Sequence, residues 1–174
     1  DVFELNGIFA QNLFEKNKRD HTFYLEQSVP IQWMYPYLEP SGLIFKLSPE
    51  PLKELTPAMI AADRKFWDAY SQRLLSNPKF RIDDDATSTF SKLAFWHSDL
   101  YHWRHLDKEE EYWLKMSLVL CPQLQEAVSN LSTLYVQQKR FDEAIAMIKQ
   151  AELDDPRNEL YPDILTWIQQ MQSF

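Results

Sequence analysis

The sequence is poor in glycine, in cysteine and in positive charge, and each shortage excludes a class of function. Only two of the 174 residues are glycine, so a glycine-rich loop that cradles a phosphate group is absent. Cys121 is the single cysteine, which excludes a disulfide or a thiolate metal cluster within the chain. Its position before Pro122 favours a buried apolar role over a catalytic thiol. The formal net charge of −8 argues against nucleic acid as the main partner.

Long apolar runs are also missing. No run approaches the roughly 18 to 20 apolar residues that a membrane-spanning helix needs, and no signal peptide is recognisable. The sequence therefore predicts that this chain does not itself insert into a membrane. Because it begins at Asp1 rather than Met, we expect it to be part of a larger protein. Aromatic residues are abundant instead, with six Trp, eight Tyr and eleven Phe, and we expect most of them in a core.

The clearest pattern lies in residues 126–156. Apolar residues recur at helical spacing from Val128 to Tyr135, and a polar run over residues 137–140 interrupts them. The apolar stripe resumes at Phe141, and Pro156 cannot continue a helix. Two helices joined by so short a turn are expected to pack as an antiparallel hairpin.

This hairpin resembles a tetratricopeptide (TPR) repeat, whose pattern is W-x2-L-G-x2-Y, then A-x3-F, then P. The residues that carry the resemblance are Val128, Leu131, Ser132, Tyr135, Ala144, Ile148 and Pro156. Each substitution within the pattern replaces a small residue by a small one or an apolar residue by an apolar one.

A second copy at the TPR period of 34 residues supports this resemblance. His97 falls in the place of Leu131 and Glu110 in the place of Ala144, which are the poorer matches. In the forward direction Leu131 falls on Leu165, which predicts a lone capping helix at about residues 159–173. The good matches are Tyr101 with Tyr135, Ser98 with Ser132, Leu114 with Ile148, and Pro122 with Pro156.

The amino-terminal part predicts a small α/β segment. We expect two short strands, whose pairing, parallel or antiparallel, the sequence leaves open. Thr56-Pro57 is typical of a helix start, with a capping hydroxyl followed by proline at the first position. The predicted elements are a helix at 5–16, a strand at 22–26, a short helix or turn at 31–38, a strand at 43–47 and a long helix at 57–75.

Together these patterns predict a mainly α fold: TPR-like helical hairpins with a capping helix, preceded by the small α/β segment. The predicted domains are an α/β lead-in region at residues 1–85 and a TPR-like region at 86–174. The repeats within the second region are expected at about 89–122 and 123–156.

A second resemblance covers most of residues 19–156. The run FYLEQSVPIQWMYPYLEPSGLIFKL at residues 23–47 is followed by a helix with Asp63 and Phe66-Trp67, and then by Phe90-Ser91-Lys92-Leu93. The part that matches best is Tyr35, Tyr37-Leu38, Gly42-Leu43 and Lys46-Leu47. In these features the chain is similar to the carboxy-terminal soluble part of a bacterial family of multi-pass membrane proteins of unassigned function, which resemble protein O-mannosyltransferases.

This resemblance implies that the chain is the soluble portion of a glycosyltransferase-like protein of the bacterial cell envelope, on the periplasmic or the cytoplasmic side. The catalytic loops of such a protein would lie among its membrane helices. The resemblance therefore assigns no catalytic residue to this chain.

A cluster of histidines offers a different, enzymatic hypothesis. His97, His102 and His105 lie close together, and Asp99 shares a helix face with His102. Asp and His at this spacing could bind a divalent metal ion. The simpler interpretation, which we favour, is a set of polar residues near a helix end, with His105 in the following turn.

Asp83-Asp84-Asp85 could likewise hold a metal–sugar-nucleotide complex, as acidic pairs do in some transferases. Acidic residues just before a helix, however, cap it and complement its dipole, and we favour that role. The acidic run at residues 107–111 has the same explanation at the start of the next helix.

The concave face of the repeats is the favoured functional site. In TPR proteins the first helix of each pair lines this face, and such a groove can take an extended peptide or a helix. The alternative is that the chain's own helices fill the groove. The predicted lining residues are Phe95, Asp99, His102, Trp103, Ser129, Thr133, Val136 and Gln137.

The sequence thus favours a non-catalytic interaction or accessory domain that needs no cofactor and no metal. Its partner would be a protein or peptide, or the membrane domain of its own parent protein. The alternative is a free-standing metal-dependent enzyme that uses Asp83–Asp85 or the histidine cluster.

Overall fold

The computed structural model describes residues 2–26 and 31–173, and most of these residues are helical. The chain divides into two compact units, Asp1–Leu74 and Leu75–Phe174, each of which is described by itself. A mainly α fold with a small α/β segment is confirmed.

The division falls between residues 74 and 75, whereas the sequence analysis placed it after residue 85. The short helix α3 (Pro78–Arg81) packs against α4 (Asp84–Trp103) and so belongs with the second unit. The rings of Phe80 and Phe90 lie 5.9 Å apart at this contact.

The first unit contains an antiparallel sheet of three strands rather than the expected two. Its order is β1-β3-β2, so the strand pairing that the sequence left open is antiparallel throughout. A tight turn joins β2 to β3 at Gly42, whose φ of 71° favours glycine. The added strand, β2, contains Pro40, which is tolerated because β2 is an edge strand, where an N–H can be missing. The strands are β1 (Phe23–Leu25), β2 (Leu38–Ser41) and β3 (Ile44–Leu47).

Helix α1 (Val2–Asn17) packs on the sheet and on the 3-10 helix η1 (Gln32–Tyr37). The buried ring of Phe14 lies 5.5 Å from that of Phe23 and 5.1 Å from that of Tyr37. The indole N–H of Trp33 donates a hydrogen bond to the carbonyl of Gly7 at 3.2 Å. Residues 27–30, part of the run that carries the second resemblance, lie outside the described residues.

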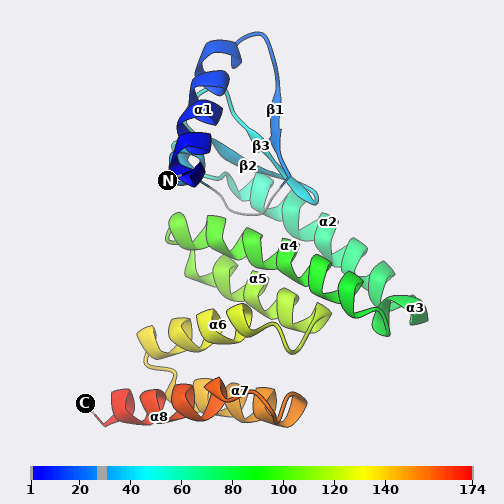
Figure 1. The fold of residues 1–174 in the computed structure, drawn as a ribbon, viewed down its shortest axis with the longest axis vertical. Coiled ribbons are helices and arrows are strands. Elements are labelled where there is room, and N and C mark those ends of the chain that lie inside the picture. The colour runs from blue at the N-terminus through cyan, green and yellow to red at the C-terminus, as the bar shows by residue number, and fades with distance from the viewer. Residues whose placement is uncertain (1, 27–30, 174) are drawn as a thin grey trace. The chain divides into compact units, whose positions relative to one another are not determined.

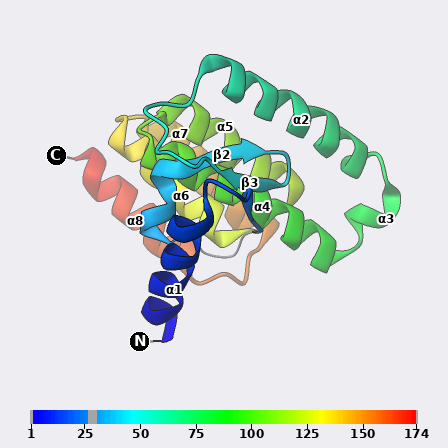
Figure 2. The ribbon, with the colours of Figure 1, turned by 90° about the horizontal axis from the view of Figure 1, so that it is seen from above.

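Helix α2 (Pro57–Leu75) begins as the sequence predicted, because the Thr56 hydroxyl accepts a hydrogen bond from the backbone N–H of Met59 at 3.2 Å. The indole N–H of Trp67 donates to the carbonyl of Gly42 at 3.0 Å and ties the helix to the β2–β3 turn. Figure 2 shows α2 running along one side of the sheet.

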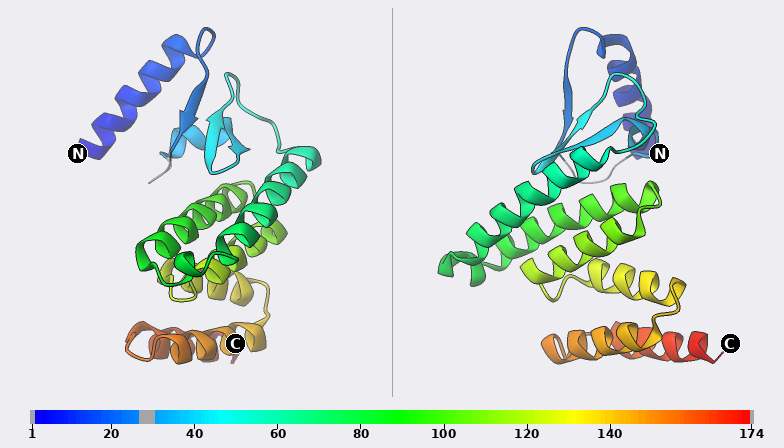
Figure 3. Two further views of the ribbon diagram at one scale, coloured as in Figure 1. Left: turned by 90° about the vertical axis from the view of Figure 1, so that its right-hand side faces the viewer. Right: turned by 180° about the vertical axis from the view of Figure 1, so that it is seen from behind.

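The second unit is a run of helices in which neighbours in the chain pack side by side (Figures 1 and 3). The helices after α4 are α5 (Asp107–Leu120), α6 (Gln125–Gln137), α7 (Phe141–Asp154) and α8 (Leu160–Gln172). Helix α4 begins at Asp84, earlier than the repeat boundary expected near residue 89. The cause is Asp83, whose carboxylate accepts from the N–H of Ala86 at 2.9 Å and caps the helix there.

The two hairpins, α4–α5 and α6–α7, share one backbone design with a period of 34 residues. Each inter-helix turn contains one residue with positive φ, His105 at 56° and Lys139 at 59°. Equivalent hydrogen bonds close both hairpins at equivalent distances. They join Leu106 N to Tyr101 O (2.9 Å) and Arg140 N to Tyr135 O (2.8 Å), and Cys121 N to Ser117 O (2.9 Å) and Asp155 N to Ala151 O (2.9 Å).

The core of the second unit is continuous from α5 to α8. Ala144 on α7 and Ile148 one turn later are completely buried, as are Tyr161 and Ile168 on α8. Helix α8 therefore covers the apolar side of the second hairpin, which is the place expected for the capping helix.

Candidate functional site

A polar pocket of about 150 Å³ opens between α4, α5 and α6. Helices α4 and α6 are the first helices of the two hairpins, and both contribute to its lining. The pocket brings together Asp99, His102, Thr133 and Gln137, which are four of the eight residues expected on this face. The full lining is Asp99, His102, Glu110, Asn130, Thr133, Leu134 and Gln137, and we call it the polar pocket.

The other four expected residues lie outside the pocket. Val136 is only 6% exposed and belongs to the core, which corrects its assignment to an open face. Phe95 also packs against that core. The carbonyl of Ser129 accepts hydrogen bonds from neighbouring hydroxyls on α6. Trp103 is partly exposed, with the guanidinium of Arg104 4.9 Å from its ring centre.

Glu110 is one of three lining residues that the sequence analysis missed, the others being Asn130 and Leu134. The side chain of Glu110 is almost fully buried, and its carboxylate lies 3.0 Å and 3.1 Å from Nδ1 of His102. Burial raises the pKa of Glu110, and the contact with His102 opposes that rise. The acidic run 107–111 predicted a helix start, but nothing in the sequence distinguished Glu110, whose carboxylate lines this pocket, from the other acidic residues of the run.

Asp99 is the second carboxyl group of the pocket. Burial raises its pKa to about 6; His102 opposes the shift and the charge of Glu110 adds to it. An acid with this pKa responds to pH changes near neutrality and to any positive charge placed beside it. Perturbed pKa values of this kind are typical of functional sites.

The histidines do not form a metal site. His97 is completely buried and its ring stacks 4.5 Å from that of Trp113. His102 contacts Glu110, whereas His105 occupies the turn after α4. Throughout residues 2–26 and 31–173 there is no group of three or more His, Cys, Asp or Glu side chains that could hold a metal ion.

The acidic run Asp83–Asp85 is explained by helix capping. Asp83 is the N-cap of α4, and the other two carboxylates lie in its first turn, where the helix dipole favours negative charge.

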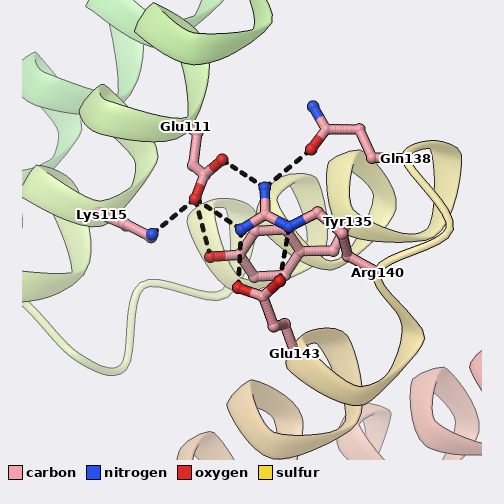
Figure 4. Close-up of polar contacts among 6 residues, drawn as sticks. All are labelled: Glu111, Lys115, Tyr135, Gln138, Arg140 and Glu143. Atoms are coloured by element: carbon pink, nitrogen blue, oxygen red, sulfur yellow. Dashed lines mark hydrogen bonds and ion pairs between the residues drawn. The ribbon is translucent and has the colours of Figure 1, made fainter.

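A second polar cluster, at Glu111, joins the two hairpins (Figure 4). The guanidinium of Arg140 donates to both carboxylate oxygens of Glu111, at 2.6 Å and 3.0 Å, and lies 4.2 Å from the ring centre of Tyr135. Lys115 approaches the same carboxylate at 2.6 Å. Arg140 in particular holds the pKa of Glu111 well below its ordinary value, at about 2. Since Glu111 is on α5 and Arg140 precedes α7, the cluster fixes one hairpin against the next.

Comparison with known proteins adds no identification. No family model matches the sequence, and a search of curated proteins found no match. Among the described residues, no helix is both long enough and apolar enough to cross a membrane.

Proposed function

We propose that the chain is a non-catalytic, TPR-like interaction domain that binds an extended peptide segment on the face formed by α4 and α6. The repeated hairpin supports this proposal, because adjacent first helices built on one backbone design present their outward side chains side by side. The proposed partner is another protein or the membrane domain of the parent protein.

The observation that carries the proposal is the polar pocket between the two first helices. Side chains of α4 and α6 converge there, and two of its lining residues, Thr133 and Gln137, are exposed. Trp103, which follows His102 in the chain, is partly exposed and could contribute apolar contact area to a bound peptide. Burial of the Glu110 carboxyl group beside this pocket costs free energy, which favours a role beyond packing.

The wider setting is also a proposal. In it, the chain is the soluble portion of a glycosyltransferase-like membrane protein of the bacterial envelope, and its binding face would serve to recruit a polypeptide. The resemblance in the run 23–47 supports this setting.

The test is selection of peptides from a random library by the immobilised chain, followed by affinity measurements in solution. We expect selected peptides to lose at least roughly fivefold in affinity with Gln137→Ala, which removes a polar group from the lining of the pocket. The matched control is Gln169→Ala, an exposed glutamine on α8. Peptides that bind both variants as well as the unaltered chain would reject this face as the binding site.

A further inference from the structure

We propose that the polar pocket recognises a primary ammonium or guanidinium group, such as the end of a lysine or arginine side chain. The proposal deepens the function proposed above, because it names the residue type that a bound peptide would present. The pocket's chemistry can nevertheless be tested without any peptide.

The size of the pocket limits what can enter it. Its volume of about 150 Å³ lies below the roughly 300–1,000 Å³ of typical small-molecule sites. The head group of one side chain fits this space, whereas a nucleotide or an organic cofactor does not.

The lining matches a cation. When ionised, Asp99 and Glu110 offer hydrogen-bond acceptors and no donor, and the side chains of Asn130, Thr133 and Gln137 each carry an acceptor oxygen. Ammonium and guanidinium groups carry only donors, three and five respectively. The charged groups around Asp99 are His102 from α4 and Glu110 from α5, while the lining residues of α6 are uncharged.

In the second hairpin an equivalent backbone forms without this acidic character. Ala144 occupies the place of Glu110 and is completely buried where the helices cross. Burying a carboxyl group at such a position costs free energy, and the same backbone forms in the second hairpin without it. The carboxyl group of Glu110 therefore calls for a role other than packing.

Glu110 is nearly buried, so an incoming ligand reaches it by displacing His102. Its partner His102 has a side chain that is 66% exposed, so the imidazole can turn outward and leave the carboxylate to a cation. A bound cation would replace the favourable interactions with water that Asp99 and Glu110 lose through burial, and would favour their ionised forms.

The test uses small probes on the full chain. We would titrate it with n-butylammonium and n-butylguanidinium, with n-butanol as the neutral control, and follow the side-chain amide signals of Asn130 and Gln137 by NMR. We expect saturable shifts with both cations and none with butanol. Binding should weaken roughly tenfold between about pH 7.5 and pH 5, as Asp99 takes up its proton.

Two variants sharpen this test. Asp99→Asn should reduce the affinity for either cation roughly tenfold, because it removes one of the two carboxylates. Asp142→Asn removes the same charge from an exposed site on α7 and should leave the affinity unchanged. Equal shifts with butanol, equal weakening by the two variants, or the absence of saturable shifts would overturn the cation site. Since no peptide is used, such a failure would leave peptide binding on this face to its own test.

Discussion

The two hairpins of the second unit have the same backbone and different interiors. Both turns place one residue at positive φ and are closed by equivalent hydrogen bonds, 34 residues apart. Where the second hairpin has Leu131, Ala144 and Met147, however, the first has His97, Glu110 and Trp113. The frame therefore depends on a few positions, such as the tyrosine before each turn, and the remaining positions can carry other chemistry.

Because of these substitutions, only the first hairpin has titratable groups at three particular positions of the repeat, those of His97, Asp99 and Glu110. Glu110 and His97 are buried in the first hairpin, and Asp99 lies close to Glu110. The equivalents of these three residues in the second hairpin are Ala144, Leu131 and Thr133, none of which ionises. Because burying a carboxyl group costs free energy, we expect the first hairpin to be less stable for carrying Glu110 than it would be with alanine at that position.

The largest expected effect comes from making the second hairpin like the first. Ala144→Glu would bury a carboxyl group where the equivalent of His102 is the apolar Val136, so the new charge would have no partner. We expect a loss of about 3–5 kcal/mol in the free energy of unfolding, measured by urea denaturation. A loss below about 1 kcal/mol would mean that the second hairpin accepts a buried carboxyl group as readily as the first, and that the difference between the two interiors does not affect stability.

A smaller effect is expected from separating the hairpins at Glu111. Arg140→Ala removes the guanidinium that donates to both oxygens of that carboxylate, and should lower the free energy of unfolding by about 1–3 kcal/mol. Lys115→Ala, at a more exposed partner of the same carboxylate, is the control and should cost under about 0.5 kcal/mol.

The same cluster predicts a pH dependence. The pKa of Glu111 is about 2 in the folded chain and has its ordinary value of 4.5 when unfolded. Its stabilisation is therefore complete above about pH 5 and is lost as the pH falls toward 2. In Arg140→Ala, the free energy of unfolding, measured by urea denaturation at a series of pH values, should fall less between about pH 5 and pH 2 than in the unaltered chain. An equal fall in both would contradict the role given to the contact between Arg140 and Glu111.

Asp99 predicts a pH dependence of the opposite sign. Its pKa of about 6 lies above its ordinary value of 3.8, so the folded chain holds this proton more tightly than the unfolded chain does. Stability should therefore fall as the pH rises from about 4 to about 6. Asp99→Asn should remove that fall and stabilise the chain by about 1–2 kcal/mol at pH 7.5, a value reduced for the partial exposure of Asp99. The control Asp142→Asn should keep the wild-type profile.

Sequence reasoning succeeded where a structure depends on neighbouring residues. The caps at Thr56 and Asp83 were predictable, because a capping side chain and the N–H that it binds are only three residues apart. Strand β2 was not predicted. It contains Pro40, and proline argues against a strand unless the strand lies at the edge of a sheet, which only the tertiary structure shows.

The candidate site was predictable only in part. A helical face and a 34-residue frame placed Asp99 and Gln137 near each other, but the same frame gave no sign that Val136 turns into the core. The roles of Glu110 and Glu111 depend on residues of other elements, eight and 29 positions away. Pairing over such separations leaves no periodic signal in a single sequence.

Glu110→Ala is the variant that tests the central claim most directly, because it gives the first hairpin the residue that the second already has. The measurement is the free energy of unfolding together with the affinity for n-butylammonium, on the same sample. We expect stability to be unchanged or raised by up to about 1 kcal/mol, with cation binding lost. A chain that is destabilised by more than about 2 kcal/mol and still binds the cation would show that Glu110 serves folding, and would contradict the claim.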